Sequence, residues 1–264
     1  GSIYNGRSAG TEYGAMHDWW LYPLLFGGGL VAGFVNVLAG AGSALTLPLL
    51  IFAGLSPAVA NASNRIGILA ENALASRHFL MKDLVAPRFA AGLALWTLPG
   101  AILGAWSSVH LGGTLFQRIL VLVLLFSAVT LYLPADLARR LHRLPQRYPA
   151  AIYPAMLLLG FYGGFIQAGI GFLFIFVLRA FLDIPLARIN AHKTFIIALY
   201  TLPALLVFVL LHQVDWLLGG IVGAGAVVGA HFSSKLTLSR HGELWIKIVV
   251  TLVILAMGIR LWFF

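Results

Sequence analysis

The stretch GAGSALTLPLLIFAGLSPAVANASNR, residues 40–65, decides the fold that we expect for this chain. It contains a glycine-serine break, a short apolar run, a Ser-Pro turn, and a polar cluster at the start of a long apolar segment. One cation, Arg65, follows the turn, and in a diverged copy of the stretch Lys193 does the same. We expect the two copies to meet in the fold and to hold an anion between them. The copy matches residues 40–42, 56–57 and 61–64 with Gly169-Ile170-Gly171, Ile184-Pro185 and Asn190-Ala191-His192-Lys193.

The composition indicates a membrane protein that crosses the bilayer several times. Of 264 residues, 61% are hydrophobic and only 9% are charged, whereas a soluble domain carries about 25% charged residues. The chain has no cysteine, which excludes disulfides and thiolate metal sites. The net charge of +9 does not indicate nucleic acid, because the cations cluster in short loops between apolar runs, as membrane orientation requires.

The apolar runs fall into two series. A membrane-spanning helix needs about 20 apolar residues, and two runs, 43–53 and 172–182, are too short for a full crossing. Each follows a Gly-x-Gly break and precedes an x-Pro turn, so we interpret each as a half-helix or a strongly tilted short helix. Each half of the chain then reads long, short, long, long, long. The predicted long segments are 19–38, 58–79, 89–109 and 114–133, followed by 152–168, 186–211, 216–234 and 244–264.

A basic, proline-bounded linker at 134–149 divides the chain into a first transmembrane repeat, 17–133, and a second, 150–264. Residues 1–16 are polar and glycine-rich, and we interpret them as a cloning scar or a flexible tail.

The positions of the cations predict how the segments cross. If every segment crosses, most lysines and arginines outside the spans lie on one side, and only Arg7, Arg118 and Arg260 lie on the other. The positive-inside rule favours this arrangement. An odd number of crossings per repeat then inverts the second repeat and places both termini outside the cytoplasm. We therefore predict an all-α polytopic membrane protein of two inverted repeats with five segments each, each with one short or broken helix near the bilayer midplane.

The glycine breaks are candidate binding elements. Gly40, Gly42 and Ser43 in the first copy, and Gly169 and Gly171 in the second, precede a short helix. A helix N-terminus attracts anions, and glycines let a ligand approach the backbone. The alternative is that these glycines only allow close helix packing.

Arg65 and Lys193 are candidate anion ligands. A charge at this depth of a span costs at least about 2.5–3.5 kcal/mol, so a functional role is expected, although an ion pair or a side chain that reaches the interface is the alternative. Asn61 and Arg65 lie four residues apart on one helical face, with Asn64 beside them. Guanidinium and amide donors together can satisfy the oxygens of one oxyanion.

Glu71 is the carboxylate that lies deep within a long apolar run. It could balance Arg65 or Lys193, or it could carry a coupling proton. His192 is the other proton candidate, although a lone membrane histidine can equally serve as a hydrogen-bonding group. The sum of Arg65, Lys193 and Glu71 leaves one positive charge, which predicts a bound anion.

Asn36 and Gln167 form another matched pair, each one turn before its glycine break. Their amides either line the site or hydrogen-bond the broken backbone. The tryptophans fall mostly near segment ends, which an interfacial belt explains.

The segments GFVNVLAGAGSALTLPLLIFAGLSPAVANASNR and GGFIQAGIGFLFIFVLRAFLDIPLARINAHKT resemble the sulfite exporter TauE/SafE family of anion permeases, over nearly the whole chain from Trp19. The resemblance implies transport of sulfite, a sulfonate such as sulfoacetate, or another small organic anion across the bacterial inner membrane. It implies Gly40, Gly42, Ser43, Asn61, Asn64, Arg65, Gly169, Gly171, Asn190 and Lys193 as substrate-binding residues.

We therefore predict a secondary transporter for a small sulfur-containing anion, not an enzyme, with a coupling proton as an option. A passive anion channel would use the same site. An intramembrane serine hydrolase, with Ser43 as nucleophile and His192 or His231 as base, leaves the repeat unexplained. No metal or cofactor is predicted. The expected partners are the anion and the lipid bilayer, with a homodimer left open.

Overall fold

A computed structural model describes residues 19–40, 42–111, 113–130 and 149–235, without the side chains of residues 38, 39, 113, 124–130 and 235. The described part of the chain is helical, with no strand. Three of its helices are long and apolar enough to cross a membrane, at Pro87–His110, Leu186–Leu210 and Trp216–Ser234. The predicted tail 1–16, the predicted linker 134–149 except Pro149, and the predicted segment 244–264 lie outside the described residues.

The helices follow the predicted order. The first half has α1 (Leu21–Ala39), α2 (Ser43–Phe52), α3 (Pro57–Met81), α4 (Pro87–His110) and α5 (Gly113–Thr130). The second half has a short 3-10 turn η1 (Pro149–Ala151), then α8 (Ile152–Phe165), α9 (Ile170–Phe181), α10 (Leu186–Leu210) and α11 (Trp216–Lys235).

The proline turns and glycine breaks set these boundaries. Pro57 and Pro87 occupy the first positions of α3 and α4, where the missing N–H costs no helical hydrogen bond. Gly40 and Gly169 have positive φ angles of 79° and 69°, which glycine adopts without strain. The all-α prediction is therefore confirmed for the described residues, and a short helix follows each break, α2 with 10 residues and α9 with 12. The predicted span 152–168 is observed as a shorter helix, α8, of 14 residues.

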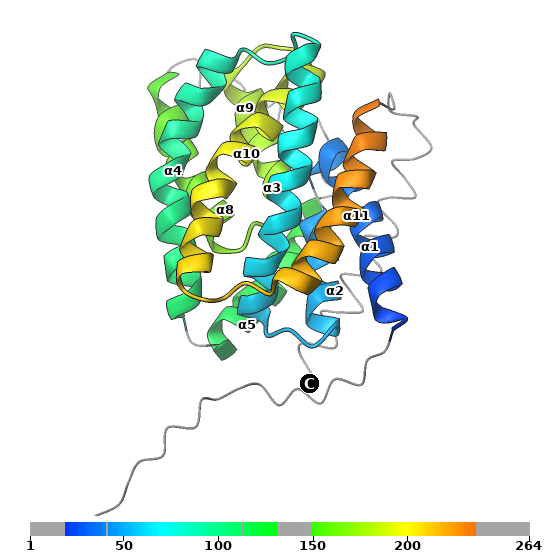
Figure 1. Cartoon of the computed structure of the whole chain (residues 1–264). Helices are drawn as coiled ribbons and strands as arrows, with labels where there is room; N and C mark the ends of the chain where they lie inside the picture. The colour runs from blue at the N-terminus through cyan, green and yellow to red at the C-terminus, as the bar shows by residue number, and fades with distance from the viewer. Residues whose placement is uncertain (1–18, 41, 112, 131–148, 236–264) are drawn as a thin grey trace, which may run out of the picture.

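The helices pack crosswise between the two halves. We call α1, α2, α3 and α11 the first bundle, and α8, α9, α10 and α4 the second bundle. Figure 1 shows α1 and α11 on one side, α4 and α8 on the other, and α3 and α10 between them. The third long helix of each half, α4 or α11, therefore packs in the bundle that contains the first helix of the other half.

Matched glycine pairs bring the crossed helices close together. A Cβ at Gly33 on α1 would overlap the Ala226 carbonyl on α11, and one at Gly164 on α8 would overlap the Ala101 carbonyl on α4. Close approach of backbones through small residues is how membrane helices pack without a hydrophobic driving force. The same overlap recurs at other glycines of these four helices, namely Gly29, Gly225 and Gly229 in the first bundle and Gly100, Gly104 and Gly160 in the second.

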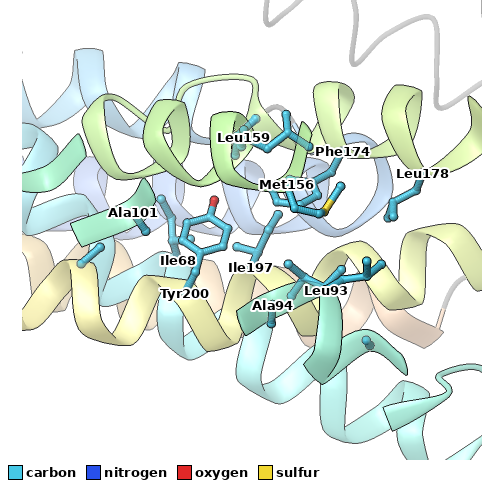
Figure 2. Packing of buried hydrophobic residues seen from close by; sticks show 14 of the residues in the cluster. Ile68, Leu93, Ala94, Ala101, Met156, Leu159, Phe174, Leu178, Ile197 and Tyr200 are labelled. Atoms are coloured by element: carbon cyan, nitrogen blue, oxygen red, sulfur yellow. The ribbon is translucent and has the colours of Figure 1, made fainter. Parts of the chain in front are cut away.

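The largest hydrophobic core joins α3 and α4 to α8, α9 and α10. Figure 2 shows Met156, Phe174, Ile197 and Tyr200 directed toward one another within it. The rings of Phe174 and Tyr200 stack with centroids 5.9 Å apart. This core packs α10 against the other helices of its bundle and so sets which α10 side chains lie opposite α3.

Candidate functional site

The two glycine breaks lie back to back. A Cβ on Gly40 would overlap the Cα of Gly171, and a Cβ on Gly171 would overlap the Cα of Gly40. The Ser43 hydroxyl donates a hydrogen bond of 3.2 Å to the Gln167 carbonyl oxygen across this contact. The breaks that the sequence singled out therefore meet, with the start of α2 beside the end of α8.

Arg65 on α3 is completely buried and reaches into the second bundle. Its Nη1 donates to the Gly163 carbonyl at 2.9 Å and to Gln167 Oε1 at 2.7 Å. Its Nη2 donates to the Gly164 carbonyl at 2.5 Å, and the guanidinium lies 4.8 Å from the centre of the Phe208 ring. Because the last carbonyls of a helix lack partners within the helix, Arg65 caps the C-terminal turn of α8. Its Nε has no partner among the described residues.

Lys193 on α10 makes the reverse contact. Its side chain is 1% exposed, and Nζ donates to the Asn36 carbonyl at 3.5 Å, near the C-terminal end of α1. Each bundle therefore sends one buried cation to the broken helix end of the other.

The asparagines of the two polar clusters repeat this pattern. Asn61 Nδ2 on α3 donates to the Phe165 carbonyl of α8, and Asn190 Nδ2 on α10 donates to the Val37 carbonyl of α1, both at 2.8 Å. The carbonyl oxygens of both asparagine side chains have no hydrogen bond within the described part of the chain. The structure thus places Asn61 and Asn190 at equivalent positions, where they join the bundles through the broken ends.

Glu71 is 2% exposed and lies on the first-bundle side of this junction. Asn36 Nδ2 donates to Glu71 Oε1, and the Gly42 N–H donates to Asn36 Oδ1 at 3.2 Å. The Lys193 ammonium lies within electrostatic range of the carboxylate. Asn36 therefore ties Glu71 to the first glycine break.

A small cavity, about 10 Å³, lies beside Glu71. This volume is at the lower limit for holding one water molecule, and it is too small for a sulfonate. Asn64, which is 3% exposed, also faces the cavity. The full lining is Ala32, Gly42, Ser43, Thr46, Asn64, Gly67, Ile68, Glu71, Val222 and Ala226.

Gln167 and His192 have several hydrogen-bond partners each. Gln167 has a positive φ of 65°, accepts from Arg65, and donates to Thr201 Oγ1 at 3.2 Å. His192 Nε2 accepts from the Ala86 N–H at 3.2 Å, so Nδ1 donates to the Arg188 carbonyl at 2.7 Å. His192 therefore hydrogen-bonds to the residue before α4 and to its own helix. Within the described residues it makes no hydrogen bond to Ser43, as a serine hydrolase would require.

The structure thus brings most of the predicted site residues to one junction. The sequence did not predict that Arg65 donates to the carbonyls of Gly163 and Gly164. Every residue has a carbonyl, so residue type does not indicate which carbonyl will accept from a cation. Thr46 was also missed, although it lies one helical turn after Gly42. The described residues contain no group of three or more His, Cys, Asp or Glu that could hold a metal ion.

Comparisons with known proteins agree along most of the chain. A probable membrane transporter protein of Haemophilus influenzae is 28% identical over 235 residues, covering 87% of this chain and 90% of the relative. The probable membrane transporter protein YfcA of Escherichia coli K12 is 28% identical over 246 residues, covering 91% and 89%. The probable membrane transporter protein ORF9 of a Sinorhizobium species is 26% identical, covering 91% and 92%.

No solved structure matches this chain. The family described as sulfite exporter TauE/SafE matches residues 25–261, which include both glycine breaks, both buried cations and all the described helices except the first turn of α1. The chain belongs to the sulfite exporter TauE/SafE family.

Proposed function

We propose that this protein is a secondary transporter that moves a small sulfur-containing anion, such as sulfite or an organosulfonate, across the bacterial cytoplasmic membrane. The observation that carries the proposal is the pair of buried cations, Arg65 and Lys193, each reaching across the junction of the two bundles. Family membership and the names of the relatives support transport. The choice of a sulfur anion rests on the family description.

The charge at the junction favours an anion. Arg65, Lys193 and Glu71 are the buried Arg, Lys, Asp and Glu side chains within the described residues, and they sum to one positive charge. An unbalanced charge in a low-dielectric interior is costly, so a monovalent anion near the two cations would lower the free energy. The α2 and α9 N-termini at the breaks would add favourable dipoles.

The hydrogen bonds suggest how an anion would enter. In the described conformation, carbonyl oxygens of Gly163, Gly164 and Asn36 accept from the two cations. Oxyanion oxygens can replace carbonyl oxygens as acceptors and bind a guanidinium more strongly. We infer that the bundles separate at this junction, and that the anion takes the place of these carbonyls. The amide side chains at the junction would then move together with the broken helix ends. These amides are Asn61, Asn190, Asn36 and Gln167.

The crosswise packing supports an inverted repeat. Equivalent contacts link α1 with α11 and α8 with α4, and α3 meets α10 at the centre. Inverted repeats with broken helices at mid-bilayer are the architecture of many secondary transporters. With the cation-rich loops inside, both termini would lie outside the cytoplasm. Glu71 or His192 would carry a coupling proton if transport is proton-driven.

A thermal-shift screen tests the proposed substrate class. Ligands that bind only the folded state raise its apparent stability, so sulfite or sulfoacetate should raise the midpoint of the purified protein more than sulfate or acetate do. Arg65→Gln should remove this shift. Arg118→Gln, which makes the same change at an exposed arginine of α5, should keep it.

Flux in proteoliposomes separates the two transport classes. Saturable flux that anion on the opposite side accelerates would indicate a carrier, whereas electrical currents far above carrier turnover would indicate a passive channel. If Arg65→Gln folded and still bound the anion normally, the proposed site would be wrong.

A further inference from the structure

Among the residues that line the cavity beside Glu71, the polar side chains mainly present hydrogen-bond acceptors. The Ser43 hydroxyl donates its hydrogen to the Gln167 carbonyl, and the Thr46 hydroxyl donates to the Gly42 carbonyl at 3.4 Å. Both hydroxyls therefore have only lone pairs left to offer the cavity. Glu71 uses one oxygen to accept from Asn36 and Asn72, and no described residue hydrogen-bonds its second oxygen. A cavity of this kind attracts a cation rather than an anion.

Asn64 provides a second, independent observation. It faces the cavity and is 3% exposed, yet it makes no hydrogen bond within the described part of the chain. A buried amide without a partner costs about 1–3 kcal/mol, so such a group calls for an explanation. An amide can turn either its oxygen or its nitrogen toward a ligand, since its orientation follows the hydrogen-bond network. Its oxygen would be one more acceptor directed at the cavity.

Size and charge favour a monovalent ion. The cavity is about 10 Å³, which is close to the space for one water-sized particle. Glu71 is the single carboxylate in the cavity lining, which favours a monovalent over a divalent cation. Calcium usually takes six to eight oxygen ligands, more than Glu71, Asn64, Ser43 and Thr46 supply. In secondary transporters, unwound backbone carbonyls and the C-terminal ends of half-helices coordinate sodium ions, and Gly42 of the first glycine break lines this cavity.

We propose that this cavity binds a dehydrated sodium ion, held by Glu71, Asn64, Ser43 and Thr46, and that sodium is the ion coupled to transport. The site itself stands on the cavity and its ligands. Only the coupling role rests on the proposed anion transport.

The charges around the cavity explain why sodium and anion would bind together. Sodium adds a positive charge to a junction that already holds Arg65 and Lys193, where Glu71 is the one buried carboxylate among the described residues. Lys193 lies within electrostatic range of Glu71, so it lowers the sodium affinity until an anion arrives. By linkage, each ion then raises the affinity for the other by the same factor. Couplings of this kind are about 5- to 150-fold.

The second half of the chain has no equivalent of this ligand set. At the positions that correspond to Ser43, Thr46, Gly67 and Glu71, it carries Phe172, Ile175, Ile196 and Tyr200. These are larger side chains, and three of them have no oxygen. We therefore expect one sodium ion per chain at this kind of site.

Sodium binding can be measured without any transported anion. Purified full-length protein is titrated with sodium chloride, potassium chloride or choline chloride at constant ionic strength, while thermal stability and binding of radiolabelled sodium are followed. We expect sodium alone to raise the midpoint by a few degrees and to saturate. Thr46→Val and Asn64→Leu should weaken sodium binding at least tenfold. Thr97→Val is the matched control, because Thr97 is also a buried hydroxyl bonded to a helix carbonyl, that of Ala94, and it should bind sodium as the parent does.

Equal stabilisation by all three salts would overturn the proposal, and so would stability that follows pH but not sodium, which would indicate a proton on Glu71. Unchanged sodium binding in both folded cavity variants would also overturn it. Adding sulfite or sulfoacetate should raise the sodium affinity at least fivefold. Sodium binding without any anion effect would support this site and contradict only the coupling, so the two proposals fail in different ways.

Discussion

The two halves of the molecule have similar helices at the junction but different side chains there. The helices α3 and α10 each run for 25 residues after a proline turn, and each sends an asparagine to the broken helix of the other half. Beyond these asparagines the side chains diverge. Where the first half has Asn64 and Glu71, the second half has Lys193 and Tyr200.

This difference separates the residues that build the junction from those that we propose bind ions in it. Glycines and asparagines recur in both halves because they satisfy the backbone at the breaks. The divergent residues place a carboxylate and an amide at a small cavity of the first bundle, whereas in the second half the Tyr200 ring stacks on Phe174. Each prediction below substitutes a matched residue in each half and compares the two effects.

The largest effect should come from the glycines of the crossed helices. Gly33→Val and Gly164→Val each place side-chain atoms where a carbonyl of the facing helix lies. The backbone of the facing helix cannot move aside as a flexible side chain can. Each change should therefore lower the free energy of unfolding by more than overpacking usually does, which is about 1–3 kcal/mol. We expect both variants to lose the folded monodisperse peak in detergent size-exclusion chromatography.

Gly92→Val on α4 is the matched control, because nothing lies within 4 Å of a Cβ at Gly92. It should give a normal peak. If only one of the two crossed-helix variants failed to fold, the two bundles would not be equivalent, and the repeat interpretation would lose its main structural support.

The next largest difference should separate the two cations. Arg65→Gln removes hydrogen bonds to three buried acceptors, and buried groups left unpaired cost about 1–3 kcal/mol each. Lys193→Gln removes one longer bond, and the new amide can still donate to the Asn36 carbonyl. We therefore expect Arg65→Gln to lower thermal stability by several degrees more than Lys193→Gln, in scans by intrinsic fluorescence. An equal loss would mean that net charge, rather than capping of α8, determines stability here.

The helices could be predicted from the sequence because their ends carry clear chemical signals. The predicted segment 186–211 is observed as Leu186–Leu210, and 43–53 as Ser43–Phe52. Apolar runs set the lengths, and Gly40 and Pro57 mark the breaks. The burial of Arg65, Lys193 and Glu71 also follows from their positions within apolar runs.

The partners of these residues could not be predicted in the same way. Sequence gives no sign that Arg65 will meet the carbonyls of Gly163 and Gly164, since every residue has a carbonyl. The cavity beside Glu71 arises where small residues such as Gly67 face each other across helices, and this depends on the crosswise packing of the two halves. Local patterns describe each helix, whereas the junction is a product of tertiary contacts.

A smaller and more even effect is expected for the reciprocal asparagines. Asn61→Ala and Asn190→Ala each remove a 2.8 Å hydrogen bond to a carbonyl at a broken helix end. Each should lower the free energy of unfolding by about 1–3 kcal/mol, the range for leaving a buried carbonyl unpaired. Denaturation of the purified variants should show the two losses within about 0.5 kcal/mol of each other. A clear inequality would show that one broken end carries more of the junction than the other.

The smallest effect concerns the turns before α3 and α10, which achieve the same geometry by different means. Ser56 caps α3 by accepting from the Val59 N–H at 3.4 Å, and loss of a cap costs at least about 0.5 kcal/mol. Pro185 precedes α10 without a side-chain cap, and replacing a compatible proline costs about 0.4–1 kcal/mol through the unfolded chain. Ser56→Ala and Pro185→Ala should therefore lower thermal stability by similar small amounts and leave anion binding unchanged. If Ser56→Ala instead cost more than Asn61→Ala, the turn rather than the contact with α8 would hold α3 in place, and the junction would matter less to the fold than its shared asparagines indicate.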